Sequence, residues 1–175
     1  TVFSPEKQEG ICSICGAKQS RDNGSKLTAT MKLNVTSIKL QKKQTTTKVK
    51  VTGLANGDSV KSWTSSNKKI VTVDKNGKIK AGKKTGSAKI TITLKSGKKA
   101  TLKVKVQSAK VKTTKITGLK TKLTLKKGKS LTLKPVISPI TSQEKVTYTT
   151  SNKKVATVTK KGVIKAKKKG TVTIT

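Results

Sequence analysis

Apolar and polar residues alternate along several short stretches of the chain. Valine, isoleucine or leucine stands at every second position there, mostly with lysine or threonine between. The clearest stretches are Val49 and Val51, then Ile90, Ile92 and Leu94, then Leu102, Val104 and Val106. A period of two predicts β-strands that bury one face and expose the other. The sequence contains no amphipathic helical stretch, so the pattern predicts an all-β protein.

Turn-forming residues separate these stretches. Groups that contain Asn, Asp, Ser or Gly stand at 55–58, 74–77, 95–97 and 126–128. Each group can supply the positive φ that tight connections between strands require. Short strands at this spacing predict a β-sandwich.

One unit of sequence occurs twice. Residues 63–91 align with residues 148–175 when a one-residue gap is allowed near Thr85, and Ser66–Lys69 then falls on Ser151–Lys154. The further matched pairs are Gly77 and Gly162, Ile79 and Ile164, Ala81 and Ala166, Gly86 and Gly170, and Ile90 and Ile174. Repetition in one register predicts two tandem domains of the same fold.

The order of residues in the repeat resembles the bacterial Ig-like domain, group 2, a family that occurs in surface proteins of the invasin and intimin type. Both copies hold an aromatic residue, Ser-Asn, an apolar strand, a Gly turn, an Ile-x-Ala segment, a second Gly and an alternating strand. The resemblance covers about residues 33–107 and 115–175 and implies two tandem immunoglobulin-like β-sandwich domains. The second copy has no equivalent of residues 100–107, so we expect that domain to lack its last strand.

The chain is therefore divided into four parts. Residues 1–31 are expected to be the end of a preceding module or a linker, a short irregular N-terminal segment. Residues 32–107 form the first Ig-like domain and residues 115–175 the second, which is incomplete at its C-terminal end. Residues 108–114 form a short joint without Pro, which favours a semi-rigid connection.

The net charge of +36 attracts polyanions, over a screening length of about 8 Å at physiological salt. The exposed lysine clusters are candidate contacts for anionic cell-wall or host glycans: Lys83, Lys84, Lys98, Lys99, Lys167, Lys168 and Lys169. Such runs also serve as solvated turns and protect edge strands from pairing. Specific nucleic-acid binding is not expected, because Arg21 is the only arginine, stacking aromatics are scarce and no recognition helix is predicted.

The sequence contains few of the side chains that catalytic sites use. The chain has no histidine and only six carboxylates. Asp58 and Asp74 stand in turns beside Gly and Lys, and Glu144 stands in a polar loop, which are positions where carboxylates bond to the local backbone. The sequence predicts a protein that is not an enzyme and that needs no cofactor.

Cys12 and Cys15 form a C-x-x-C motif followed by Gly16. The motif has the shape of half a zinc site, but no further Cys or His in the chain could complete four ligands. The alternatives are a local disulfide or two reduced thiols, and an oxidising exterior favours the disulfide.

Trp63 and Tyr148 occupy the same position in the repeat. An exposed aromatic platform would bind sugars by stacking, whereas an aromatic on this strand of an Ig-like sandwich usually packs between the sheets. We expect packing, because these are the only large side chains of the two domains.

The resemblance implies a non-catalytic module at the bacterial cell surface or in a secreted protein, serving as a stalk or spacer and in cell adhesion. An alternative is a binding module for anionic glycans such as mucin or teichoic acid, or an accessory domain of a secreted carbohydrate-active enzyme. Other modules of the same parent protein are expected partners. No apolar run reaches the roughly 18 residues of a membrane span, so no membrane insertion is expected.

Overall fold

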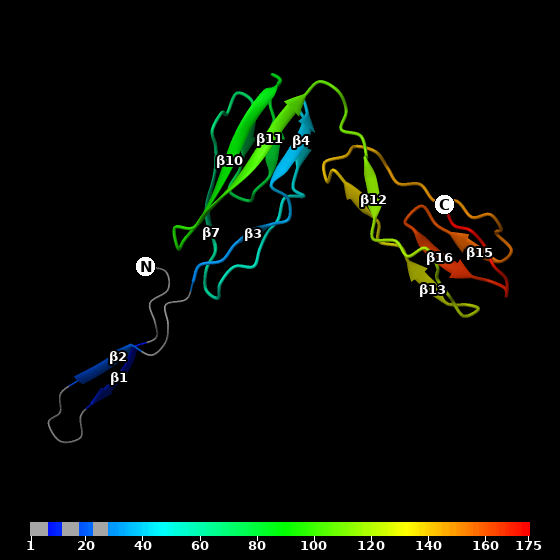
Figure 1. The fold of residues 1–175 in the computed structure, drawn as a ribbon, viewed down its shortest axis with the longest axis horizontal. Coiled ribbons are helices and arrows are strands. Elements are labelled where there is room, and N and C mark those ends of the chain that lie inside the picture. The colour runs from blue at the N-terminus through cyan, green and yellow to red at the C-terminus, as the bar shows by residue number, and fades with distance from the viewer. Residues whose placement is uncertain (1–6, 12–17, 23–27) are drawn as a thin grey trace. The chain divides into compact units, whose positions relative to one another are not determined.

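The computed structural model describes residues 7–11, 18–22 and 28–175. All regular elements in these residues are β-strands, as the alternation predicts (Figure 1). None of the described segments forms a helix long and apolar enough to cross a membrane. The chain divides into two compact units, residues 1–109 and residues 110–175, each of which is described by itself below.

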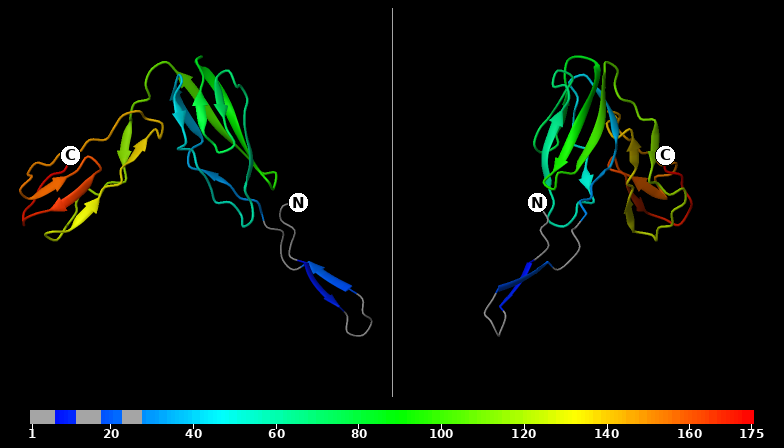
Figure 2. Two further views of the ribbon diagram at one scale, coloured as in Figure 1. Left: turned by 180° about the vertical axis from the view of Figure 1, so that it is seen from behind. Right: turned by 60° about the vertical axis from the view of Figure 1, so that its left-hand side comes forward.

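The larger sheet of the first unit has four strands. They are β4 (Ser37–Gln41), β11 (Lys99–Gln107), β10 (Gly86–Leu94) and β7 (Val60–Ser65), in that order across the sheet. β10 is antiparallel to both of its neighbours, whereas β4 runs parallel to β11. Strands β10 and β11 are therefore interior, and β4 and β7 form the edges (Figures 1 and 2).

The opposite layer of this unit is built from shorter strands. β5 (Thr45–Thr46), β9 (Ile79–Ala81) and β8 (Val71–Val73) form an antiparallel sheet. β3 (Lys32–Leu33) pairs separately with β6 (Val51–Thr52). Short strands follow from the turn groups, which interrupt the alternation every few residues.

The two layers bury aliphatic side chains against each other. The large sheet contributes Ile38, Leu40, Ala88, Ile90, Ile92, Leu94, Leu102, Val104 and Val106, and the opposite layer contributes Val71, Ile79 and Ala81. In β10 and β11 the buried residues alternate with more exposed ones, because successive side chains of a strand point to opposite faces. The predicted immunoglobulin-like sandwich with an aliphatic core is confirmed for this unit.

A two-stranded hairpin stands in the segment before the first sandwich. β1 (Lys7–Ile11) pairs antiparallel with β2 (Lys18–Asp22). Cys12 and Cys15 lie outside the described residues, so their predicted disulfide and its alternatives remain predictions.

The second unit repeats the sandwich with shorter elements. β13 (Ser130–Thr132), β16 (Val163–Ala166) and β15 (Ala156–Val158) form one antiparallel sheet. β12 (Lys115–Thr117) pairs antiparallel with β14 (Val136–Ser138). Fewer aliphatic residues are buried here than in the first unit, with Ala156, Ile164 and Ala166 among them.

Turn hydrogen bonds fix the equivalence of the two units. Gln44 donates its backbone N–H to Gln41 and accepts from Ala81, while Lys129 donates to Lys126 and accepts from Ala166. From Gln41 to Ala81 the second unit thus follows the first at a constant offset, and the same offset places Leu123 at the position of Ile38.

The described part of the second unit has no counterpart of β11. Ile38 is 4% exposed and lies in a strand, whereas Leu123 is 42% exposed and lies in no strand. The segment equivalent to β4 has no neighbour to pair with, and its backbone therefore stays irregular. Residues 110–175 thus form a sandwich in which the position of β11 is not filled by a strand.

The stretch 108–114, predicted as a joint, contains a buried residue. Val111 is 3% exposed. Its backbone N–H donates to Oε1 of Gln143 at 3.2 Å, and its carbonyl accepts from the N–H of Gln143 at 3.0 Å. Residue 111 thus packs within the second unit.

Candidate functional site

The asparagine of the Ser-Asn motif, together with the hydroxyl residue just before the motif, shapes a turn in each repeat. Ser65 donates its hydroxyl to the carbonyl of Val71 at 2.7 Å, and the side-chain oxygen of Asn67 accepts the N–H of Lys69 at 3.0 Å. In the second unit Thr150 bonds the carbonyl of Ala156, and Asn152 accepts from Lys154. The side chains of these repeated polar residues bond to the backbone of their own turn. The residues that define the repeat therefore stabilise the fold.

The repeated aromatic residues pack on a glycine turn. A β-carbon built on Gly77 would lie 2.8 Å from Cζ2 of Trp63, and one built on Gly162 would lie 2.9 Å from Cζ of Tyr148. Both aromatic residues are half-buried. Their rings pack against the glycine turns, which supports a packing role over sugar stacking.

The three carboxylates of the sandwich units accept hydrogen bonds from their own turns or from a neighbouring segment. Asp58 accepts from the N–H of Ser59 and from the N–H and hydroxyl of Ser96. Asp74 accepts from the N–H groups of Asn76 and Lys78.

Their environments shift two of these pKa values. Partial desolvation opposes the shift at Asp58, yet the hydrogen bonds from Ser96 and Ser59 and the nearby Lys95 lower its pKa on balance. At Glu144 hydrogen bonds from Thr113 lower the pKa. Each carboxylate thus holds a loop in place.

Within residues 7–11, 18–22 and 28–175, no three His, Cys, Asp or Glu side chains gather as metal ligands would.

The structure separates the lysine clusters predicted from the sequence. Lys83 and Lys84 are exposed in the loop before β10, whereas Lys98 and Lys99 are exposed at the turn after it. Since β10 has nine residues, these clusters stand at opposite ends of the sheet, roughly 26 Å apart along the strand. The ammonium group of Lys98 also donates to the carbonyl of Ala29 at 2.6 Å.

Lys167, Lys168 and Lys169 are exposed in the loop after β16. This loop is the second unit's equivalent of the Lys83 and Lys84 loop. The seven predicted lysines therefore form three surface groups, and whether any of them contacts a polyanion stays a prediction.

A denser group of lysines lies on the outer face of the large sheet. Cross-strand register sets Lys89 opposite Lys103 and Lys39 opposite Lys105, and all four side chains are exposed. We call these four residues the basic face. They line an open depression of about 590 Å³ together with Ser37, Ser66 and Ser87.

The charge on the basic face is of one sign. The sequences of β4, β7, β10 and β11 contain no Asp, Glu or Arg, and their one aromatic residue is Trp63. Like charges placed directly opposite each other on a sheet are destabilising. The arrangement thus raises the local positive potential at some expense of stability.

The lysines of the basic face do not form a contiguous run in the sequence, so they were not among the predicted lysine clusters. The available signal was lysine at every second position, as in Lys103 and Lys105 around Val104. Alternation predicts that these lysines share a face, but only the pairing of β4 with β11 brings Lys39 beside them.

Two turns extend the positive surface at one end of the sheet. Lys42 donates its backbone N–H to Gln107 at 2.9 Å, and Lys43 donates to Gly82 at 3.1 Å. The loop that holds Lys83 and Lys84 therefore lies beside the turn that holds Lys42 and Lys43, at the end of β10 nearer to the basic face.

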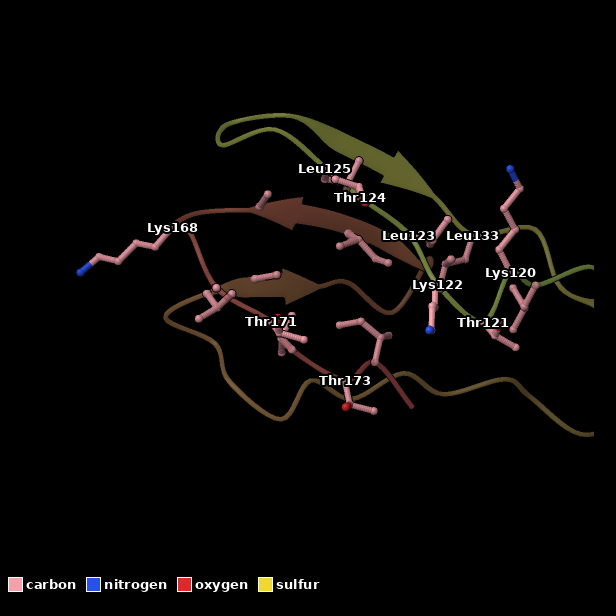
Figure 3. A pocket seen from close by; sticks show the side chains of 18 residues that line it. Lys120, Thr121, Lys122, Leu123, Thr124, Leu125, Leu133, Lys168, Thr171 and Thr173 are labelled. Atoms are coloured by element: carbon pink, nitrogen blue, oxygen red, sulfur yellow. The ribbon is translucent and has the colours of Figure 1, made fainter.

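The second unit has a groove, lined by both apolar and polar side chains, where the first has a strand. The groove, of about 570 Å³, lies between residues 119–125 and 170–174. Leu123 and Leu125 lie on one side of it, and Thr171 and Thr173 lie on the other (Figure 3). In the first unit β11 lies between the equivalent segments, β4 and β10. The groove is thus the space that a last strand occupies in a closed sandwich of this type.

Comparison with known proteins agrees with the architecture. Over 55 residues the chain is 54% identical to the kappa-carrageenase of Pseudoalteromonas carrageenovora, a match that covers 31% of this chain and 14% of that protein. The chain thus spans only a small part of this relative. The family model of the bacterial Ig-like domain (group 2) matches residues 28–104 and again residues 110–175. The resemblance predicted from the repeat is confirmed, and the chain belongs to the bacterial Ig-like domain (group 2) family.

Proposed function

We propose that this chain is a non-catalytic module of a bacterial protein that acts outside the cell, at the surface or in secreted form. Its Ig-like domains serve as a stalk or spacer that separates other modules of the parent protein, and so support cell adhesion. The observation that carries the proposal is the tandem repeat of one fold, in which the same turn bonds recur in both units.

The use of polar side chains supports a mechanical role. Asp58 ties the loop before β7 to the turn after β10 through Ser96. Glu144 ties its loop to Thr113 in the second unit. Carboxylates engaged in this way stiffen the connections between strands, which is what a spacer under tension requires.

Single-molecule pulling on the full chain tests the spacer role. A spacer made of independent domains should unfold in separate events. The first unit should resist more force than the second, because it has a complete four-stranded sheet. A single event in which both units unfold together would contradict the proposal.

A second candidate function is an accessory module that binds an anionic polysaccharide. Two observations favour it: the stretch shared with a kappa-carrageenase and the one-signed charge of the basic face. In this reading the module holds its parent protein near a charged substrate or host glycan.

Binding to immobilised polymers tests this second function. The probes are kappa-carrageenan, mucin, wall teichoic acid and neutral dextran, each at low and at physiological salt. Saturable binding to an anionic polymer at physiological salt would support an accessory binding role. If all binding fades together as salt rises, the charge acts without specificity, and the second candidate is excluded.

A further inference from the structure

We infer that the outer face of the β4–β11–β10–β7 sheet is a binding site for a linear anionic polysaccharide, centred on the basic face. The inference rests on the second candidate function. It adds where the polysaccharide lies and which of the two units binds it.

The lysines form a regular array. Neighbouring strands are about 4.8 Å apart and alternate residues of one strand are about 6.6 Å apart. Lys89 and Lys103 face each other across one strand pair, and Lys39 and Lys105 across the next. An array of lysines anchored at this regular spacing fits a polymer that carries an anionic group at regular intervals, because the flexible side chains can adjust to it. An isolated small anion would use only one corner of it.

The depression supplies hydrogen-bond donors between the cations. Ser37, Ser66 and Ser87 line it together with the lysines. The hydroxyl oxygen of Ser66 accepts the backbone N–H of Lys89 at 2.9 Å, which leaves the hydroxyl proton as a donor. Serine hydroxyls and lysine ammonium groups together match the oxygens of sulfate or carboxylate groups and the hydroxyls of sugars.

Edge protection does not explain this lysine group. Exposed lysines on an edge strand discourage pairing with another chain. Lys89, Lys103 and Lys105, however, lie on β10 and β11, which are hydrogen-bonded on both sides. A negatively charged ligand would reduce the repulsion between these like charges.

The second unit provides an internal comparison. At the constant offset between the units, Thr124 stands at the position of Lys39, and in the aligned repeat Thr173 stands at the position of Lys89. The described part of that unit holds no strand equivalent to β11, which carries Lys103 and Lys105. The loop of Lys83 and Lys84 thus has a lysine-rich counterpart in residues 110–175, whereas threonine stands there at the positions of Lys39 and Lys89.

The chemistry of the face favours a polysaccharide over a nucleic acid. Single-stranded nucleic acids bind to grooves in which aromatic side chains stack on bases, and guanine and phosphate are recognised by the forked donors of arginine. The depression is lined by lysine, serine and small aliphatic residues. Lysine offers a compact charge that suits sulfate and carboxylate groups spaced along a sugar chain.

The test uses the full chain and substitutions taken from its own repeat. The face variant Lys39→Thr/Lys89→Thr introduces the residues of the second unit. The control variant Lys78→Thr/Lys80→Thr removes the same charge from exposed positions at β9 in the opposite layer. Threonine suits exposed strand positions, and circular dichroism melts check that both variants fold. If the face variant does not fold, Lys103→Thr/Lys105→Thr takes its place.

Binding is measured at about 150 mM salt, where the screening length is about 8 Å. The probes are dextran sulfate, polygalacturonate, neutral dextran and a poly-dT oligonucleotide. We expect the face variant to bind the sulfated or the carboxylated polymer about tenfold more weakly than the control variant does. The two anionic polymers show which group the site prefers.

The outcomes separate the site from the function on which it rests. If the unmodified chain does not bind either anionic polymer at this salt, the second candidate function fails. If it binds and both variants lose the same affinity, the function stands and the location on the basic face is wrong. Equal or tighter binding of poly-dT, lost in the face variant, would overturn the polysaccharide as the ligand.

Discussion

Trp63 lies so close to Gly77 that a β-carbon on the glycine would stand 2.8 Å from Cζ2 of the indole ring. Gly77 also has a φ of 76°, in the left-handed region that L-residues with a side chain rarely adopt. The β8–β9 turn and the aromatic residue of β7 thus require each other. Because Tyr148 and Gly162 repeat the arrangement, the pair is a folding device of the domain.

Replacing Gly77 with Ala should destabilise the first unit by about 2–4 kcal/mol. Backbone strain contributes roughly 1–2 kcal/mol and the clash with the indole contributes the remainder. Gly97→Ala is the matched control, because its φ is 87° but no atom lies within 4 Å of the added carbon. Urea unfolding followed by Trp63 fluorescence measures both. Equal losses in the two variants would show that the ring contact is not needed.

The stability of the first unit should depend on Asp58 at acid pH. The hydrogen bonds of Ser96 and Ser59 lower the pKa of Asp58 in the folded state, so this contribution is complete above the unfolded pKa of about 3.9. It is lost as the pH falls through the lower folded pKa. Thermal melts between pH 6 and pH 2 should show a steeper acid loss for the wild type than for Asp58→Asn. Parallel curves would contradict a structural role for the carboxylate.

Equivalent apolar positions in the two units should tolerate truncation differently. Ile38→Ala removes a side chain that is 4% exposed and should cost about 2–4 kcal/mol. Leu123→Ala alters a side chain that is 42% exposed and should cost less than about 1 kcal/mol. Chemical denaturation of each variant measures the difference. A large loss from Leu123→Ala would mean that the second unit buries this residue in solution.

Adding a last strand should stabilise the second unit. Thr175 aligns with Thr91, so a copy of residues 92–107 placed after Thr175 continues the repeat. The added strand should fill the groove and bury Leu123 and Leu125, a gain of about 2–4 kcal/mol. The matched control carries threonine in the copy at the positions of Leu102, Val104 and Val106. No difference in melting temperature between the two extended chains would contradict the assignment of the groove as a strand position.

The sequence predicted the parts of the fold that depend on local pattern. Alternation identified the residues that are buried in β10 and β11, such as Ile90 and Leu102, because a strand's period of two fixes which face each residue occupies. The repeat predicted two domains of one fold.

The alternation of residues along one strand does not predict which other strand it pairs with. Nothing in the alternation of Ser37–Gln41 indicates that this strand pairs in parallel with β11, because pairing is set by the packing of the whole sandwich. Lys39 and Lys105 are therefore far apart in sequence and adjacent in the sheet. For the same reason the sequence predicted Lys83 and Lys98 equally as polyanion contacts, although the two lysines lie at opposite ends of β10.

Chemical-shift mapping on the full chain tests the central claim most directly. Isotope-labelled protein is titrated with a short sulfated or carboxylated oligosaccharide at about 150 mM salt. The account predicts that the shifts concentrate on the amides of Lys39, Lys89, Lys103 and Lys105. Shifts spread evenly over the lysine loops of both units, with no excess on the large sheet, would contradict it.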